Sequence, residues 1–99
     1  MKSFKAAQLL CTLATNGEFQ KLKNYIEYGK LDPKVGDYDQ RTAMHLACSE
    51  GHLEIVKYLF EKGVDLYQKD RFGNDSFECA KMSKKENIIE FLNSKILKE

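Results

Sequence analysis

The feature that most constrains this chain is an internal repeat of about 33 residues. Two clear copies are related by a shift of 33, which brings together Asp37 and Asp70, Thr42 and Asp75, Ala47 and Ala80, Val56 and Ile89, and Leu59 and Leu92. A looser copy precedes them at a shift of 34, where Gly17 falls on Gly51 and Gly29 on Gly63. A unit of this size buries its apolar face only by stacking on its neighbours. The 99 residues therefore predict a short stack of three copies.

Each copy is predicted to form a pair of helices. Apolar residues recur at three- and four-residue steps from Leu53 to Phe60, which indicates an amphipathic helix that Gly63 can end in the left-handed conformation. Its partner is expected over 43–49, with Thr42 as the N-cap. In the third copy, Asp75 and Glu78 have the spacing of a capping box, so a helix should begin at the equivalent place.

The middle copy resembles a known family. Thr42 to Ala47 read TAMHLA where ankyrin repeats have T-P-L-H-x-A, and GHLEIVKYLF over 51–60 and GVD over 63–65 follow in the expected places. The resemblance implies an all-α ankyrin-repeat solenoid of stacked helix-turn-helix pairs with projecting β-turn fingers. We expect one domain over 1–99, with approximate repeats at 4–36, 37–69 and 70–99.

The segments Val35 to Arg41 and Gln68 to Asn74 are rich in Asp, Gly and Asn and correspond to the two fingers of such a stack. Gln40 stands where the family usually has glycine. Because glycine tolerates a positive φ and glutamine does not, we expect the first finger to depart from ideal turn geometry.

Composition and charge limit the kinds of partner and the cellular compartment that we expect for this chain. Sixteen Lys and Arg against fifteen Asp and Glu leave a net charge of +1, so nucleic acid and anionic membranes are not expected partners. The sequence holds no apolar run of membrane-spanning length, and its N-terminus does not read as a signal peptide. Cys11, Cys48 and Cys79 are an odd number without metal-site spacing, which favours free core thiols in a reducing, intracellular and most simply cytoplasmic setting.

No catalytic constellation is found, and we expect no enzyme activity, cofactor, metal or small-molecule substrate. In the ankyrin pattern His45 ties down a helix start and His52 lies in the turn between helices; the competing hypothesis is a small hydrolase that uses His45 and Cys48. The paired Asp37 and Asp39 are interpreted as turn formers. The basic stretch Lys81, Lys84 and Lys85 is interpreted as a solvated surface, with a phosphate-binding patch as the alternative.

Ankyrin arrays bind other proteins through their finger tips and the concave face of their first helices. Carried over to this chain, that implies a protein-interaction module with an unknown partner. The aromatic rings of Tyr38 and Phe72, flanked by Arg41 and Arg71, match the composition of binding hot spots; the alternative is that both rings pack on neighbouring fingers. The implied partner-binding residues are Tyr38, Asp39, Arg41, Ser49, Glu50, Arg71, Phe72, Asn74, Met82 and Ser83.

The fingers also resemble a narrower group. DYDQRTAMH over 37–45 and KDRFGN over 69–74 are similar to the D-Y-D-x-R-T-A-x-H and K-D-R-[WF]-x-N segments in the C-terminal ankyrin regions of glutaminases and related asparaginase-type amidohydrolases. The resemblance implies an accessory C-terminal domain of a larger protein. Alternatives are a self-association module of such an amidohydrolase, which would be mitochondrial if the parent is a eukaryotic glutaminase, and a free-standing ankyrin regulator.

Overall fold

The structure is a computed structural model that describes residues 3–96. Within these residues six helices follow one another: α1 (Ser3–Asn16), α2 (Phe19–Glu27), α3 (Ala43–Glu50), α4 (Leu53–Glu61), α5 (Ser76–Met82) and α6 (Glu86–Ile96). No helix in this range combines the length and the apolar character needed to cross a membrane.

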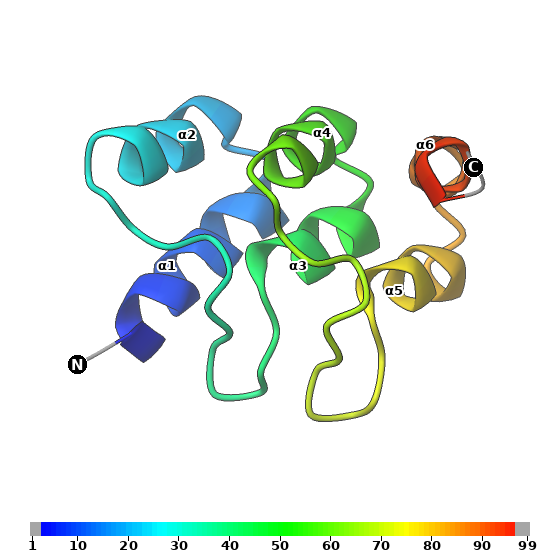
Figure 1. Ribbon diagram of the computed structural model, residues 1–99, viewed down its shortest axis with the longest axis horizontal. Coiled ribbons are helices and arrows are strands. Elements are labelled where there is room, and N and C mark those ends of the chain that lie inside the picture. Colours follow the sequence, from blue (N-terminus) through cyan, green and yellow to red (C-terminus); the bar gives the residue numbers. More distant parts are fainter. Residues whose placement is uncertain (1–2, 97–99) are drawn as a thin grey trace.

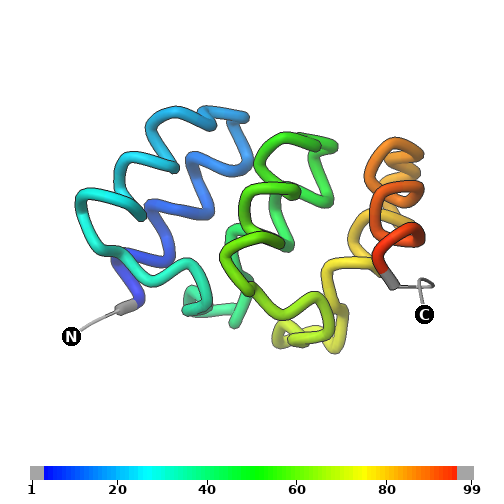
Figure 2. Tube along the Cα trace, turned by 45° about the horizontal axis from the view of Figure 1, so that its top comes forward, coloured from blue at the N-terminus to red at the C-terminus, as the bar shows by residue number. Residues whose placement is uncertain are grey.

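The helices form two rows (Figure 1). The inner row consists of α1, α3 and α5, with α3 packed between the other two, and each inner helix is paired with the outer helix that follows it. Figure 2 shows the three pairs side by side along the stack. Two long loops, one between α2 and α3 and one between α4 and α5, project beyond the inner row as fingers. The predicted all-α solenoid of helix pairs with projecting fingers is therefore confirmed.

Repeated small and large residues fill the space between the rows. Ala47 and Ala80 occupy the same repeat position on α3 and α5 and are fully buried, which lets the inner helices approach closely. Leu59 and Leu92 occupy the same position on α4 and α6 and are also fully buried. Each such leucine contributes about 1.5–3 kcal/mol by leaving water. The residues that fill the core therefore recur with the same 33-residue period as the sequence.

Both inner helices that follow a finger begin at the predicted caps. The Thr42 hydroxyl accepts from the His45 amide at 3.4 Å, and the Thr42 amide donates to His45 Nδ1 at 3.1 Å. Asp75 and Glu78 exchange the equivalent two hydrogen bonds, each 2.9 Å long. Helix α3 runs one residue past the expected Ser49 and is closed by Gly51 in the left-handed conformation (φ 80°).

One aspartate organises each finger. Asp37 Oδ1 accepts from the amides two and four residues later at 2.9 and 3.0 Å, and Asp70 Oδ1 does the same at 2.9 Å in both cases. The expected distortion of the first finger is not found, because Gln40 adopts φ 61° where the second finger has Gly73 at φ 84°. The amides of Gln40 and Gly73 donate to the carbonyls of Asp37 and Asp70 at 2.8 and 3.0 Å, so the turns match.

Exchanging the two turn residues tests this interpretation. A Cβ atom at position 73 would meet nothing within 4 Å, so the main penalty of Gly73→Gln should be its positive φ. We expect Gly73→Gln to lower the free energy of unfolding by about 1 kcal/mol, measured by urea denaturation. The reciprocal Gln40→Gly should raise it, by less, because glycine also loses more entropy on folding. Equal stability of all three proteins would contradict the assignment of strain to these positions.

Candidate functional site: the fingers and the inner helix row

The two finger tips carry exposed aromatic rings. Tyr38 is 68% exposed and Phe72 is 65% exposed. The Tyr38 ring lies 4.6 Å from the ring of Phe4 on α1, centroid to centroid, and the Arg71 guanidinium lies 5.6 Å from the Phe72 centroid. The Tyr38 ring therefore packs on α1, and the Phe72 ring lies beside the arginine of its own finger. Most of each ring faces solvent.

A pair of contacts joins the fingers to each other. The Arg71 guanidinium donates to Asp39 Oδ1 at 2.9 Å, and the Arg71 amide donates to the Asp39 carbonyl at 2.8 Å. An exposed ion pair of this kind contributes only about 0.2–1 kcal/mol. Together with the backbone hydrogen bond, however, it fixes the position of one tip relative to the other. Asp39 and Arg71 thus link two rings that lie 34 residues apart in the sequence.

Arg41 lies at the base of the fingers. Its Nε is 3.8 Å from Asp70 Oδ2, a carboxylate that is almost fully buried, and a third of the Arg41 side chain remains exposed. The Cys11 thiol on α1 donates to the Arg41 carbonyl at 3.3 Å. Asn74 is tied down as well, since its carbonyl is 3.0 Å from His45 Nε2. These two predicted contact residues therefore hold the fingers to the inner row.

The remaining predicted residues lie at the end of the inner helices away from the helix starts. The Ser49 and Ser83 hydroxyls share a hydrogen bond of 3.2 Å between α3 and the end of α5. Glu50 is exposed and Met82 is 65% exposed. Ser83 is the C-cap of α5, because the helix ends at Met82.

Sequence reasoning missed one residue of this surface, Phe4. It is 48% exposed on the first turn of α1, at the start of the first repeat. With Tyr38 and Gly36 it lines an open depression of about 500 Å³ that extends to Gln68 and Lys69 at the second finger. The available signal was an aromatic residue in an otherwise polar start of a helix.

His45 is fully buried and its ring nitrogens are both engaged. Because the Thr42 amide donates to Nδ1, the proton is on Nε2, which donates to the Asn74 carbonyl. Burial lowers the pKa of His45, although the Asn74 carbonyl opposes that shift. The neutral imidazole is thus a structural link between α3 and the second finger, as the ankyrin pattern implied.

The thiols are not arranged for nucleophilic chemistry. Cys48 has no exposed surface, and burial raises its pKa far above the ordinary value. Burial likewise raises the pKa of Cys11 to about 12, so neither thiol ionises near neutral pH. Among the described residues, no three His, Cys, Asp or Glu side chains gather where they could hold a metal ion.

The two ends of the stack differ from the finger side. On α1 the exposed residues beyond Phe4 are polar: Lys5, Gln8, Thr12 and Asn16. On α6 they are also polar: Glu86, Asn87, Glu90, Ser94 and Lys95. Polar outer faces are what terminal repeats of a solenoid need in water. Large apolar side chains therefore face solvent along the inner row at Phe4, at the finger tips and at Met82.

Comparison with known sequences defines the class of this protein. A family profile described as ankyrin repeats (3 copies) matches residues 5–97. The chain belongs to the ankyrin repeat family, whose members are generally non-catalytic modules that bind other proteins.

Individual relatives come from several kinds of protein. The chain is 40% identical over 87 residues to an L-asparaginase of Dirofilaria immitis and 40% identical over 68 residues to the mitochondrial liver isoform of glutaminase from Mus musculus. It is 45% identical over 65 residues to 26S proteasome non-ATPase regulatory subunit 10 of Rattus norvegicus. These matches cover 88%, 68% and 66% of this chain, but only 15%, 11% and 28% of the relatives' lengths. The resemblance to amidohydrolase ankyrin regions is confirmed, and it is shared with other ankyrin proteins.

A solved structure has the same fold. It is a chain from the complex of the predatory endopeptidase Bd0816 of Bdellovibrio bacteriovorus with the immunity protein Bd3460. The TM-score is 0.82 at 32% identity, over 92% of this chain and 46% of that one.

The buried histidine predicts a pH dependence of stability. Because the pKa of His45 is lower in the folded chain than the ordinary 6.5, the unfolded state binds more protons as the pH falls below that value. We expect the free energy of unfolding to decrease from pH 7 towards pH 5, measured by urea denaturation. His45→Gln keeps a capping-box residue without a titrating group and should flatten this dependence. The same slope in the variant would rule out His45 as its source.

Proposed function

We propose that this chain is a non-catalytic protein-interaction module whose contact surface is the finger side of the stack. The observation that carries the proposal is the pair of exposed aromatic rings, Tyr38 and Phe72, on two fingers that are joined to each other. The proposed contact residues are those derived from the sequence: Tyr38, Asp39, Arg41, Ser49, Glu50, Arg71, Phe72, Asn74, Met82 and Ser83.

The rings suit the role of binding anchors. Aromatic side chains and arginine are enriched among the residues that dominate binding energy, and aromatic rings bury large areas at low entropic cost. The turn hydrogen bonds of Asp37 and Asp70, with the Asp39–Arg71 pair, hold the tips before any partner arrives. Less conformational freedom is then lost on binding. We assign direct contact to the tips and to Met82, and a supporting role to Arg41 and Asn74 at the base.

The module is further proposed to act within a larger protein. The chain spans 11% to 28% of the length of the three sequence relatives described above, and two of these are amidohydrolases. Assembly of an amidohydrolase through this module is the first alternative, and a free-standing regulator is the second. The buried free thiols favour a reducing compartment such as the cytoplasm, or mitochondria if the parent is a glutaminase.

The environments of His45 and Cys48 support a binding role over a hydrolytic one. His45 is committed to Thr42 and Asn74, and Cys48 is fully buried. A hydrolase that used them would need the imidazole or the thiol to reach a substrate. Neither can do so without unpacking α3.

Affinity capture tests the contact surface. Protein captured from a cell extract by the immobilised chain should fall about tenfold for Tyr38→Ala/Phe72→Ala, because two anchor rings are lost. The matched control is Tyr25→Ala/Tyr28→Ala, which removes two exposed rings from the α2 region. Equal recovery by wild type and both variants, with circular dichroism showing intact helices, would reject the finger-tip site.

Self-association is a separate outcome. Because the exposed residues of the two terminal helices are polar apart from Phe4, we expect multi-angle light scattering to give a constant mass of 11.4 kDa from micromolar to millimolar concentration. A mass that rises with concentration would favour the assembly alternative instead.

A further inference from the structure

The outer helices are joined by a polar cluster at one interface. Between α2 and α4, the Tyr58 hydroxyl donates to Glu27 Oε2 at 2.6 Å, and the Lys62 ammonium lies 2.7 Å from the same oxygen. Lys62 also lies 5.5 Å from the centroid of the Tyr58 ring. Hydrogen bonds from Lys62 and Tyr58 lower the pKa of Glu27, so its carboxylate is charged and satisfied.

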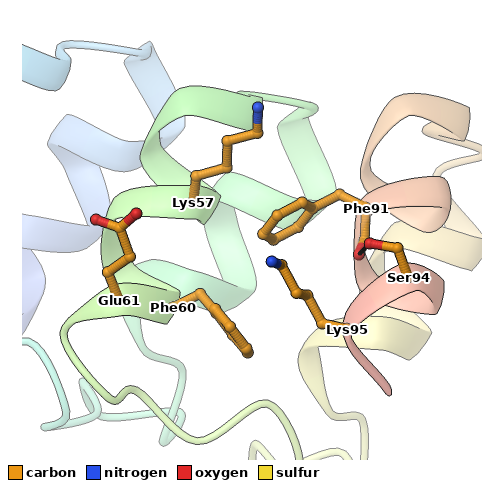
Figure 3. A pocket seen from close by; sticks show the side chains of 6 residues that line it. All are labelled: Lys57, Phe60, Glu61, Phe91, Ser94 and Lys95. Atoms are coloured by element: carbon orange, nitrogen blue, oxygen red, sulfur yellow. Dashed lines mark hydrogen bonds between the residues drawn. The ribbon is translucent and has the colours of Figure 1, made fainter. Parts of the chain in front are cut away.

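The repeat places a related but incomplete cluster at the next interface. Glu61, Phe91 and Lys95 occupy the positions of Glu27, Tyr58 and Lys62. Phe91 has no hydroxyl to donate, and the carboxylate of Glu61 is turned away from Lys95 (Figure 3). Within the described residues, no carboxylate lies within ion-pair distance of Lys95 or of Lys57.

A groove lies at this second interface, between α4 and α6. Its volume is about 610 Å³, and Figure 3 shows its lining side chains: Lys57, Phe60, Glu61, Phe91, Ser94 and Lys95. The rings of Phe60 and Phe91 meet edge to face at 5.9 Å between centroids, and both are only partly buried.

Both lysines of the groove stand over these rings. The Lys95 ammonium is 5.5 Å from the Phe91 centroid and 5.9 Å from that of Phe60, while the Lys57 ammonium is 5.9 Å from Phe91. Two ammonium groups that are not paired with a carboxylate of the described residues thus flank an accessible aromatic surface. A carboxylate brought beside them would gain charge-assisted hydrogen bonds.

We propose that the groove between α4 and α6 is a second docking site, on the face opposite the inner row, for an acidic segment of a partner protein. An apolar side chain of that segment would lie against Phe60 and Phe91, and flanking carboxylates would pair with Lys57 and Lys95. The incoming carboxylate would make the interaction with Lys95 that Glu27 makes with Lys62 at the first interface. This site is independent of the finger-tip proposal, because it uses none of the same residues.

The groove favours a protein segment over nucleic acid. Two ammonium groups of the described residues line it, which is few for holding a continuous phosphate backbone. The net charge of +1 gives no overall electrostatic attraction between two copies of this chain. A volume of this order accommodates an anchoring side chain and its neighbours.

The test uses a labelled ten-residue peptide of glutamate and leucine with a central phenylalanine as the probe. Added to the isotopically labelled chain, it should shift the amide signals of α4 and α6 in two-dimensional NMR. Lys57→Glu/Lys95→Glu should weaken its binding about tenfold, as expected when two favourable charge pairs are replaced by repulsion. Lys81→Glu/Lys84→Glu makes the same change of charge elsewhere and should leave binding within about twofold of wild type.

Phe91→Tyr provides a test that does not alter charge. The added hydroxyl can recreate the Glu27–Tyr58 contact with Glu61, raise the thermal midpoint and weaken peptide binding by occupying the groove. The proposal would be overturned by no shifts at millimolar peptide, by equal weakening in both lysine variants, or by shifts confined to the fingers. Equal shifts with a lysine-for-glutamate peptide or with oligouridylate would also overturn it. Loss of the finger-tip site in the capture experiment leaves each of these results unchanged.

Discussion

The buried imidazole of His45 is the interaction on which the arrangement of this chain most depends. One nitrogen accepts from the amide that opens α3, and the other donates to a carbonyl at the base of the second finger. A single side chain thus fixes where a helix starts and where the next loop lies relative to it. It can do so only while neutral, because a charged imidazole would have no acceptor at Nδ1 and would be buried at a cost. The stack is therefore held at its centre by a hydrogen-bond link as well as by apolar packing.

Each finger likewise depends on a single side chain. One carboxylate oxygen in each finger accepts two backbone amides, so the turn is formed without help from a partner. Asp70 also faces Arg41 from the other finger, which links the two bases, while Asp39 and Arg71 link the two tips. The exposed rings therefore lie on two fingers that are joined to each other both at their bases and at their tips. That rigidity is the physical reason for assigning recognition to the fingers.

Much of the fold followed from the sequence because it rests on local and periodic signals. The caps at Thr42 and Asp75 and the terminating Gly63 each act within a few residues of their own position. The 33-residue period is visible in the sequence without any knowledge of contacts. The candidate site was less predictable. The packing of Tyr38 on Phe4 and the direction of Arg41 toward Asp70 depend on contacts between distant segments, which periodicity does not encode. Gln40 in the left-handed conformation shows that finger geometry, imposed by Asp37, outweighs the preference of the residue at the tip.

The difference between Tyr58 and Phe91 also has a consequence for the order in which the chain comes apart. Helix α4 is joined to α2 by a hydroxyl, a carboxylate and an ammonium. Between α4 and α6 the described residues form no side-chain hydrogen bond or ion pair, and the contact consists of ring edges, cation–π contacts and the buried Leu59 and Leu92. In a linear array each repeat is stabilised only by its neighbours, so the end with fewer bonds opens first. Amide hydrogens of α6 should exchange with solvent through a local opening while those of α3 exchange only with global unfolding. Of the described helices, α6 is thus the one expected to open most readily.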